Sequence, residues 1–516
     1  MWKRIALGCI IFSFLALSFG SMVNESLTYD EVFYLEEGRR IVSTRTFSDP
    51  YNPPLASILT AIPSVFGWKS PTAARLVTIA LGVFLILAVY QVGVKALGGT
   101  GGLVAAILIA FDPSLLAHSH YITGDVPLTL FIFLAVIAWQ KFLIKPDRTR
   151  FILVGLSVGY AFATKMTAVP YVGIAFLAIV WWQRSRRGWQ WYIARGSGFV
   201  GSVIIALVFV WAAYFFTFDV VIKDREDPNR VSVRMLVYAK AHRLPALEST
   251  IIFLSQQSLP LGTYAATIKN TVLRAGKPSI VFFDGVIFDR SRWYFLIVNV
   301  LRKTPIPFVI LVGMGLLSHK KQRFVRSMVA CGAGMVLFAS FTGMAPLIRY
   351  VLPAIPFLAL VAAWGARGRK KLLVTILLLW YIAGTVLAYP HFISYANEVV
   401  GSRDRRYEVL ADSNLDWGQA LPDLARYVAN RNLGKMRFSY FGRDDGGRYG
   451  LASNTAYGSW KFEDICAFHD VVIDPKALTM ATIISVSNWY SCRYNKQEAY
   501  QKDNIRDVVA DVFLVF

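Results

Sequence analysis

Long apolar runs separated by short polar segments dominate the first 390 residues of the chain. The first run, at about 5–20, follows the basic pair Lys3 and Arg4. Ten further runs are expected to cross a membrane, several of them near the shortest length that can do so, at about 73–94, 103–117, 126–144, 151–164, 168–182, 197–217, 293–317, 324–341, 349–364 and 372–388. The pattern predicts a polytopic α-helical membrane protein with about eleven transmembrane helices.

The first run and the stretch 151–182 each allow a second interpretation. Residues 1–22 also fit a cleaved signal peptide, with a basic start, an apolar middle and small residues around 18–21. The apolar stretch 151–182 forms either one long tilted helix or two short helices broken at 164–167, with Pro170 beyond the break. Alternation of basic clusters across the membrane requires two helices, which places Lys165 at the outer surface.

Composition and charge support a membrane protein and determine its predicted orientation. The 516 residues are 55% hydrophobic and only 17% charged, too apolar for a soluble protein of this length. The net charge of +22 comes from basic clusters between apolar runs, which favour the cytoplasmic side, so nucleic-acid binding is not expected. These clusters are Lys95, then Lys145, Arg148 and Arg150, then Arg184, Arg186 and Arg187, then Lys320, Lys321, Arg323 and Arg326, and finally Arg367, Arg369, Lys370 and Lys371.

The same alternation predicts the domain organisation. Residues 1–390 form a transmembrane catalytic domain with outer loops at 23–72 and 218–292, and 391–516 form an extracytoplasmic α/β domain. The tail contains a helical pattern at 420–432 and β-rich runs at 436–441, 482–487 and 508–516. Cys466 and Cys492 are the two cysteines outside apolar runs, and on the oxidising side they are predicted to form a disulfide.

Acidic residues near the ends of two predicted helices are candidate catalytic residues. Asp30 and Glu31 follow the first apolar run, and Asp125 stands at the outer start of the run at 126–144. Ionised carboxylates at a membrane surface are costly unless they have partners or a function. The alternative is that Asp30 and Glu31 only cap a helix.

Other polar residues surround these positions. His118 and His120 are either metal ligands or interfacial polar residues, and a divalent metal is left open but not favoured. Asn52 precedes a double proline, after which 56–66 is apolar and too short to span. This segment fits an interfacial helix or a re-entrant loop.

Cations on the predicted outer face are candidates for binding a lipid phosphate. They are Lys165, Lys303 and Arg349, with Arg302 beside Lys303. Arg302 and Lys303 would be buried in the run at 293–317 unless the helix begins at 304–307, which we expect. Snorkelling of each cation to the headgroups is the alternative.

Together, these motifs resemble the membrane glycosyltransferase superfamily of the C fold. The resemblance covers most of the chain and is closest to protein O-mannosyltransferases, the aminoarabinose transferase of lipid A and bacterial phospholipid-carrier-dependent glycosyltransferases. It rests on the order of five short motifs with Asp30-Glu31, namely 52–55 (Asn-Pro-Pro-Leu), 123–127 (Thr-Gly-Asp-Val-Pro), 303–305 (Lys-Thr-Pro), 349–353 (Arg-Tyr-Val-Leu-Pro) and 412–419 (Asp-Ser-Asn-Leu-Asp-Trp-Gly-Gln).

The resemblance implies a function and roles for the residues. Asp30 matches the catalytic aspartate, Glu31 its supporting partner and Asp125 the second acidic site. The donor would be a sugar on a polyprenyl or dolichyl phosphate, held by Lys165, Arg349, Lys303 and Asn52. Relatives often carry His or Lys where this chain has the neutral Asn52, whose amide can hydrogen-bond a phosphate but brings no charge.

The expected reaction is a single displacement with inversion on the outer face of the plasma (inner) membrane. An acceptor hydroxyl on a protein, a lipid or a glycan loses its proton to Asp30, and cations stabilise the departing phosphate. The 412–419 segment, through Asp412, Asn414, Asp416, Trp417 and Gln419, is expected either to touch the acceptor or to pack the tail on the membrane domain. The alternative function is a secondary transporter or lipid flippase, and a receptor or scaffold explains the charges less well.

Overall fold

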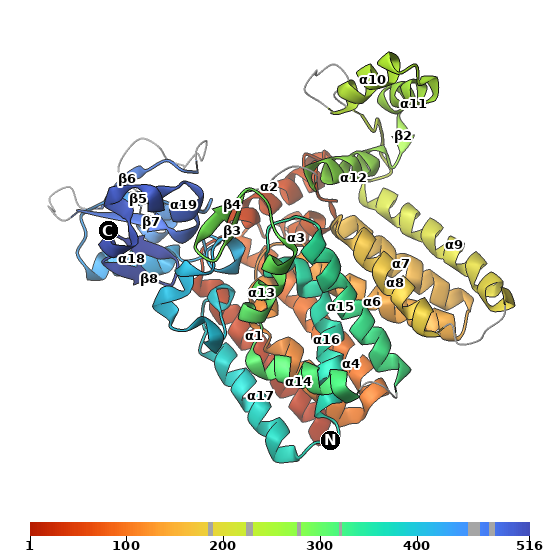
Figure 1. Ribbon diagram of the computed structural model, residues 1–516, viewed down its shortest axis with the longest axis horizontal. Coiled ribbons are helices and arrows are strands. Elements are labelled where there is room, and N and C mark those ends of the chain that lie inside the picture. Colours follow the sequence, from red (N-terminus) through yellow and green to blue (C-terminus); the bar gives the residue numbers. More distant parts are fainter. Residues whose placement is uncertain (184–188, 223–230, 276–279, 319–321, 452–464, 474–479) are drawn as a thin grey trace.

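The computed structural model describes residues 1–183, 189–222, 231–275, 280–318, 322–451, 465–473 and 480–516. A bundle of helices forms most of the molecule, a mixed sheet lies at one end beside it, and the N-terminus lies at the opposite end of the bundle (Figure 1). The predicted basic clusters at Arg184, Arg186 and Arg187 and at Lys320 and Lys321 lie outside the described residues.

The bundle consists of the helices before residue 390 other than those within 214–292. They are α1 (Trp2–Asn24), α2 (Tyr29–Thr44), α3 (Leu55–Val65), α4 (Pro71–Ala110), α5 (Pro113–Ser119), α6 (Asp125–Ile144), α7 (Arg148–Thr164), α8 (Ala168–Gln183), α9 (Trp189–Ala213), α13 (Trp293–Lys303), α14 (Ile306–Ser318), α15 (Arg323–Phe341), the 3-10 helix η2 (Ile348–Ala354), α16 (Ile355–Ala366) and α17 (Lys371–Val386). Large hydrophobic side chains such as Phe12, Leu207 and Leu379 are exposed along α1, α9 and α17, as expected for helices that face lipid.

The predicted count of eleven spans is not reproduced. By length and composition, six of the described helices are able to cross a membrane, or seven if α13 and α14 form one bent span. The run expected at 103–117 is wrong as a single helix, because α4 ends at Ala110 and α5 is separate. The glycine Gly98 has φ +84° and kinks α4 into two segments. Helices α8 and α17 have 16 residues each, fewer than the about 20 of a typical span.

Local breaks in the helices follow the sequence closely. Helices α7 and α8 are separate, with Lys165 between them, as the alternation of charge requires. Helices α13 and α14 meet at an angle of 112°, and the break falls at the predicted Thr304-Pro305. After the double proline, α3 covers the segment expected to form a short helix.

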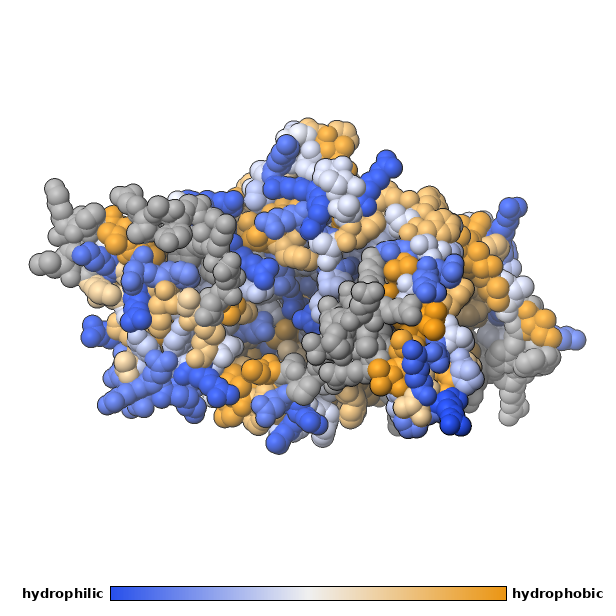
Figure 2. All heavy atoms as spheres, turned by 90° about the horizontal axis from the view of Figure 1, so that it is seen from above, coloured by the Kyte–Doolittle hydropathy of each residue, from blue (hydrophilic) through white to orange (hydrophobic). Residues whose placement is uncertain are grey.

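In its described residues, the segment between α9 and α13 forms three helices and two small two-stranded antiparallel sheets. Helices α10 (Val231–Ala241) and α11 (Pro245–Gln256) project from the bundle, and α12 (Gly262–Ala275) returns toward α2 (Figure 1). Strands β1 (Phe218–Asp219) and β2 (Leu259–Pro260) pair with each other, as do β3 (Val281–Phe283) and β4 (Val286–Phe288). Seen from above, this end of the molecule and the adjoining sheet carry many hydrophilic residues (Figure 2).

The C-terminal part contains a five-stranded mixed sheet in the order β6-β5-β7-β9-β8. Strands β5 (Lys435–Ser439), β7 (Met480–Ser485), and the hairpin of β8 (Asp507–Val509) and β9 (Phe513–Val515) fall in the predicted β-rich runs, and α18 (Leu421–Asn430) falls in the predicted helix. Strand β6 (His469–Val472) and the short helix α19 (Val486–Ser491) were not predicted. Buried side chains including Phe438, Ile483 and Phe513 form a hydrophobic core under this sheet.

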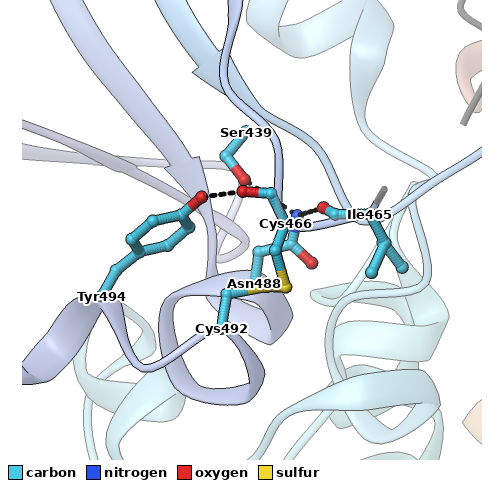
Figure 3. Close-up of a disulfide and its surroundings, with 6 residues drawn as sticks. All are labelled: Ser439, Ile465, Cys466, Asn488, Cys492 and Tyr494. Carbon is cyan, nitrogen blue, oxygen red and sulfur yellow. Dashed lines mark hydrogen bonds between the residues drawn. A yellow bond between two sulfur atoms is a disulfide. The ribbon is translucent and has the colours of Figure 1, made fainter. Parts of the chain in front are cut away.

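A disulfide joins Cys466 to Cys492, the pair proposed from sequence, with Cα atoms 5.5 Å apart. Asn488 donates hydrogen bonds to the Ile465 carbonyl oxygen, at 2.8 Å, and to Ser439 Oγ, at 3.0 Å, and Tyr494 donates one to the Cys466 carbonyl (Figure 3). The crosslink therefore attaches the segment before β6 to the end of α19.

Candidate active site

The carboxylates of Asp30 and Glu31 have different environments, although the residues are consecutive. Both lie in the first turn of α2, where Thr28 and Glu31 form a capping box. Successive helical side chains point about 100° apart. The Glu31 side chain is fully buried, whereas 31% of the Asp30 side chain is exposed. Only Asp30 of this pair is therefore accessible to a substrate.

Glu31 has every partner that a buried carboxylate needs. Arg75 donates to it through Nε, at 2.8 Å to Oε1, and through Nη2, at 2.7 Å to Oε2. The backbone N–H groups of Thr28 and Ile122 donate at 2.8 and 2.9 Å. These four bonds anchor the start of α2 to α4 and to the segment before α6, and they hold Glu31 in a fully buried position.

Asp30 pairs with Arg349 of η2. Arg349 Nη1 lies 2.6 Å from Asp30 Oδ2, and the guanidinium lies over the Trp417 ring, 4.8 Å from its centre. The Nε atom of Arg349 has no hydrogen-bond partner within the described structure. A charged group with an unused donor is suited to bind an oxyanion such as phosphate.

A second ion pair forms at the start of α6. Lys165 Nζ lies 2.7 Å from Oδ1 of Asp125, whose other oxygen, Oδ2, accepts no hydrogen bond within the described residues. His118 Nδ1 lies 3.7 Å from that oxygen, and neither ring nitrogen of this buried histidine has a hydrogen-bond partner there. Unpaired buried polar atoms are costly. Asp125 Oδ2 and the His118 ring are therefore able to bind a further polar group.

Aromatic residues connect the two ion pairs. The Tyr350 ring lies 5.6 Å from the guanidinium of Arg349 and 5.9 Å from Lys165 Nζ, so both cations border one ring. Burial raises the pKa of the Tyr34 hydroxyl well above its usual value, and the negative charges of Asp125 and Asp30 add to this effect. Residues from α2, α6, the α7–α8 break and η2 thus form one charged site.

The C-terminal part completes this site through Asp412 and Trp417. The buried Trp417 ring contacts His118, with ring centres 5.5 Å apart, as well as Arg349. Burial raises the pKa of Asp412, and the nearby positive charge of Arg349 partly offsets this effect. Two of the five residues predicted on the acceptor side therefore lie at the charged site.

Asn414, Asp416 and Gln419 instead hold the fold together, which does not support an acceptor-binding role. Asn414 accepts from the Ile348 N–H at 2.9 Å and donates to the Pro346 carbonyl at 2.9 Å. Asp416 accepts from the Ser487 N–H at 2.9 Å, and burial raises its pKa to about 7. Gln419 bonds within its own turn. For these three residues, the contacts fit the alternative that the 412–419 segment packs the tail on the membrane domain.

Two residues predicted to bind phosphate have other contacts in the structure. Lys303 is buried, and its Nζ donates to the carbonyl oxygens of Ile393, at 2.5 Å, and Asn414, at 2.8 Å. Asn52 Nδ2 donates to Asp49 Oδ2 at 2.9 Å in a local turn. Lys303 thus joins α13 to the tail, and neither contact supports the predicted phosphate role.

His120 belongs to a separate buried network at the end of α1. Its Nε2 and the Tyr121 hydroxyl both lie 2.8 Å from Glu25 Oε2. His391 bridges Glu25 Oε1 and Asp423 Oδ2, at 2.9 Å each. Among the described residues, no group of three His, Cys, Asp or Glu side chains is arranged to hold a metal ion.

The sequence analysis did not single out Arg75, although a signal was present. Arg75 lies inside the apolar run that begins at about residue 73, and a cation there needs a buried anionic partner. Glu25 and His391 were missed because nothing in their local sequence shows that residues 366 positions apart meet.

Comparison with known proteins adds two findings. Residues 51–215 match the family model described as dolichyl-phosphate-mannose-protein mannosyltransferase. A comparison with curated proteins finds no match.

Solved structures show the same fold. ArnT from Cupriavidus metallidurans in the apo state is 14% identical, with a TM-score of 0.51 over 75% of this chain, and the match covers 63% of the ArnT chain. The same protein bound to undecaprenyl phosphate is 13% identical, with a TM-score of 0.53 over 83% of this chain and 72% of the ArnT chain. This chain thus spans less than two thirds of the length of apo ArnT. By this structural likeness and the matched segment, the chain has the C fold of the membrane glycosyltransferases.

Proposed function

We propose that this protein transfers a sugar from a polyprenyl-phosphate donor to an acceptor hydroxyl on the outer face of the membrane. The observation that carries the proposal is the pair of ion pairs, Asp30 with Arg349 and Asp125 with Lys165, assembled around Tyr350. A prenyl-phosphate sugar is already activated. Its transfer needs a base for the acceptor and cations for the leaving phosphate, and this site contains both.

Asp30 is proposed as the general base. Its carboxylate is the partly exposed one of the pair at the start of α2, and it forms an ion pair with Arg349. A donor phosphate would compete for Arg349, since charge-assisted bonds to phosphate are strong. Donor binding would thereby release Asp30 to accept the proton of the acceptor hydroxyl.

Lys165 and Arg349 are proposed to hold the phosphate, and Asp125 to orient Lys165 and support positive charge at the sugar carbon. Attack of the acceptor oxygen on C1 breaks the bond from C1 to the phosphate oxygen and inverts the carbon. The proton passes to Asp30, and the free prenyl phosphate leaves. Asp412 and Trp417 are proposed to border the acceptor, because they belong to the tail and lie beside Arg349.

An apolar cavity offers a place for the prenyl chain. It has a volume of about 480 Å³ among α6, α7, α8 and α9. Its lining includes Phe162 and Val169, which stand on either side of the α7–α8 break that carries Lys165. That ArnT was solved bound to undecaprenyl phosphate also supports a lipid phosphate as donor.

We also propose the division into 1–390 and 391–516, with the second part extracytoplasmic in the plasma (inner) membrane. The test of the function is incubation of the purified full chain with a panel of radiolabelled polyprenyl-phosphate sugars. An enzyme releases free prenyl phosphate in proportion to labelled acceptor. A transporter or flippase moves the intact lipid and releases none.

A further inference from the structure

A second apolar cavity, larger than the first, lies between α4, α6 and α15. Its volume is about 1270 Å³, above the about 300–1,000 Å³ of ordinary small-molecule sites. Its lining extends from Leu81 to Ala96 on α4 and from Leu130 to Ile144 on α6. At 1.5 Å per residue, the two stretches are about 22 and 21 Å long. The length and the apolar walls suit a hydrocarbon chain that lies along the helices.

Three cations line the end of this cavity farthest from Asp125. Lys95, Lys141 and Arg323 come from three different helices, and each is exposed. Lys141 is 16 positions from Asp125 in α6, about 24 Å along the helix axis. The cluster is thus separate from the candidate active site and does not depend on the proposed function.

The positive charges at this end lack compensation among the described residues. Lys95, Lys141 and Arg323 form no ion pair in the described part of the chain. Lys95 and Arg150 lie close enough to Lys141 to repel its charge, and Asp147, the next acid along the chain, is paired with Arg150 at 3.0 Å. A bound anion would relieve this repulsion.

Amide groups complete the polar end. Gln91, Gln140 and Gln322 line the cavity beside the three cations. Their side chains supply neutral donors to phosphate or ester oxygens, and the three cations supply the charge. An apolar groove with a cationic, amide-rich end matches a lipid with an anionic headgroup.

We propose that this cavity binds an anionic membrane phospholipid. Its phosphate rests on Lys95, Lys141 and Arg323, and one acyl chain fills the groove between α4 and α6. By the positive-inside rule this end faces the cytoplasm, so the lipid comes from the cytoplasmic leaflet, whose surface is anionic.

The test uses the delipidated full chain in neutral detergent. Phosphatidylglycerol, zwitterionic phosphatidylcholine and undecaprenyl phosphate are titrated separately, and bound lipid is counted by native mass spectrometry. Phosphatidylglycerol should bind at least about ten-fold more tightly than phosphatidylcholine, since each cation near a headgroup contributes to the attraction.

A pair of triple variants separates this site from general surface charge. The site triple Lys95→Gln, Lys141→Gln and Arg323→Gln should lose the preference. The control triple Arg369→Gln, Lys370→Gln and Lys371→Gln removes the same charge from exposed residues that do not line the cavity, and it should keep the preference. Leu134→Trp fills the cavity without altering charge and should weaken phosphatidylglycerol binding. This variant replaces the site triple as the test if the triple does not fold.

Three results would overturn the proposal. One is equal binding of phosphatidylglycerol and phosphatidylcholine by the unmodified chain. Another is an equal loss of preference in both triple variants, which would mean that general surface charge and not the cavity attracts the lipid. The third is retention of undecaprenyl phosphate alone, which would identify the cavity as a donor site.

Discussion

Asp30 and Arg349 are separated by 319 positions in the sequence, yet Nη1 of the arginine lies 2.6 Å from Oδ2 of the aspartate. The arginine is held against Trp417, so the aspartate proposed as the base, the cation and the tail meet at one point. Any substrate that uses Asp30 as a base has to separate this pair first.

Replacing Asp30 with Asn should abolish transfer while the protein still folds. The amide is nearly the same size but cannot accept the proton, and loss of a general base costs about 10²–10⁴ in rate. Turnover of the purified variant is measured with the donor that the lipid-sugar panel identifies. Glu36→Gln, in an exposed residue of the same helix, is the control and should keep full activity. Near-normal turnover of the Asp30 variant would exclude its role as base.

Arg349→Ala and Lys165→Ala should raise the apparent KM for the donor more than that for the acceptor. Each removes a charge that the proposal assigns to phosphate. Arg302→Ala is the matched control, because Arg302 pairs with Asp284 at 2.9 Å, outside the site. If only the acceptor constant changes, the two cations belong to acceptor binding.

Glu31→Gln should destabilise the protein far more than Asp30→Asn does. The amide leaves the guanidinium of Arg75 buried without its counter-charge, which typically costs about 3–5 kcal/mol. Asp30 is partly solvated, and its loss should cost less than about 1 kcal/mol. Thermal unfolding in one detergent compares the two variants. Equal melting temperatures would show that the pair of Glu31 and Arg75 is not a main anchor of α2.

The network around His391 should make stability depend on pH. Burial disfavours the charged ring, but hydrogen bonds to Asp423 and Glu25 outweigh it and raise the pKa of His391 to about 9 from 6.5. The stabilisation is therefore fully present below about pH 6.5 and is lost as the pH rises through 9. Burial also opposes ionisation of Glu25, but His120 and His391 lower its pKa to about 2. Its contribution is lost only as the pH falls from about 4.5 through 2.

Melting temperatures of the unmodified chain and of His391→Gln are compared between pH 6 and about 10. The difference should be largest at the low end and shrink toward pH 10. The exposed His242 gives the control variant His242→Gln, which should follow the unmodified chain. A difference that is constant with pH would mean that His391 contributes by packing alone.

Single cysteines test the proposed orientation. Cys9 and Cys331, the free thiols, are replaced first so that the disulfide stays intact. Cysteines at Ser43 and Ser402, both exposed, should react with an impermeant thiol reagent in intact cells, and one at Thr149 should not. Labelling at Thr149 with protection at Ser402 would reverse the orientation.

Local chemistry predicted much of the fold but only part of the site. The breaks at Lys165 and at Thr304-Pro305 follow from prolines and charges in apolar runs, and the tail strands follow from β-rich runs. Sequence could not show which of Asp30 and Glu31 faces outward, because that depends on Arg75, 44 positions away. Nor could it show that Lys303 bonds to backbone carbonyls of the tail, since both partners lie about 90 or more positions downstream.

The start of α2 is attached to the tail by main-chain hydrogen bonds. The N–H groups of Ser26 and Tyr29 each donate, at 2.9 Å, to the carbonyl oxygens of Gln419 and Trp417. During synthesis the chain proceeds from the N-terminus, so Asp30 is made long before these carbonyls exist. The proposed catalytic arrangement is thus completed only after about four fifths of the chain has been translated, and we expect a chain that ends before residue 417 to be inactive.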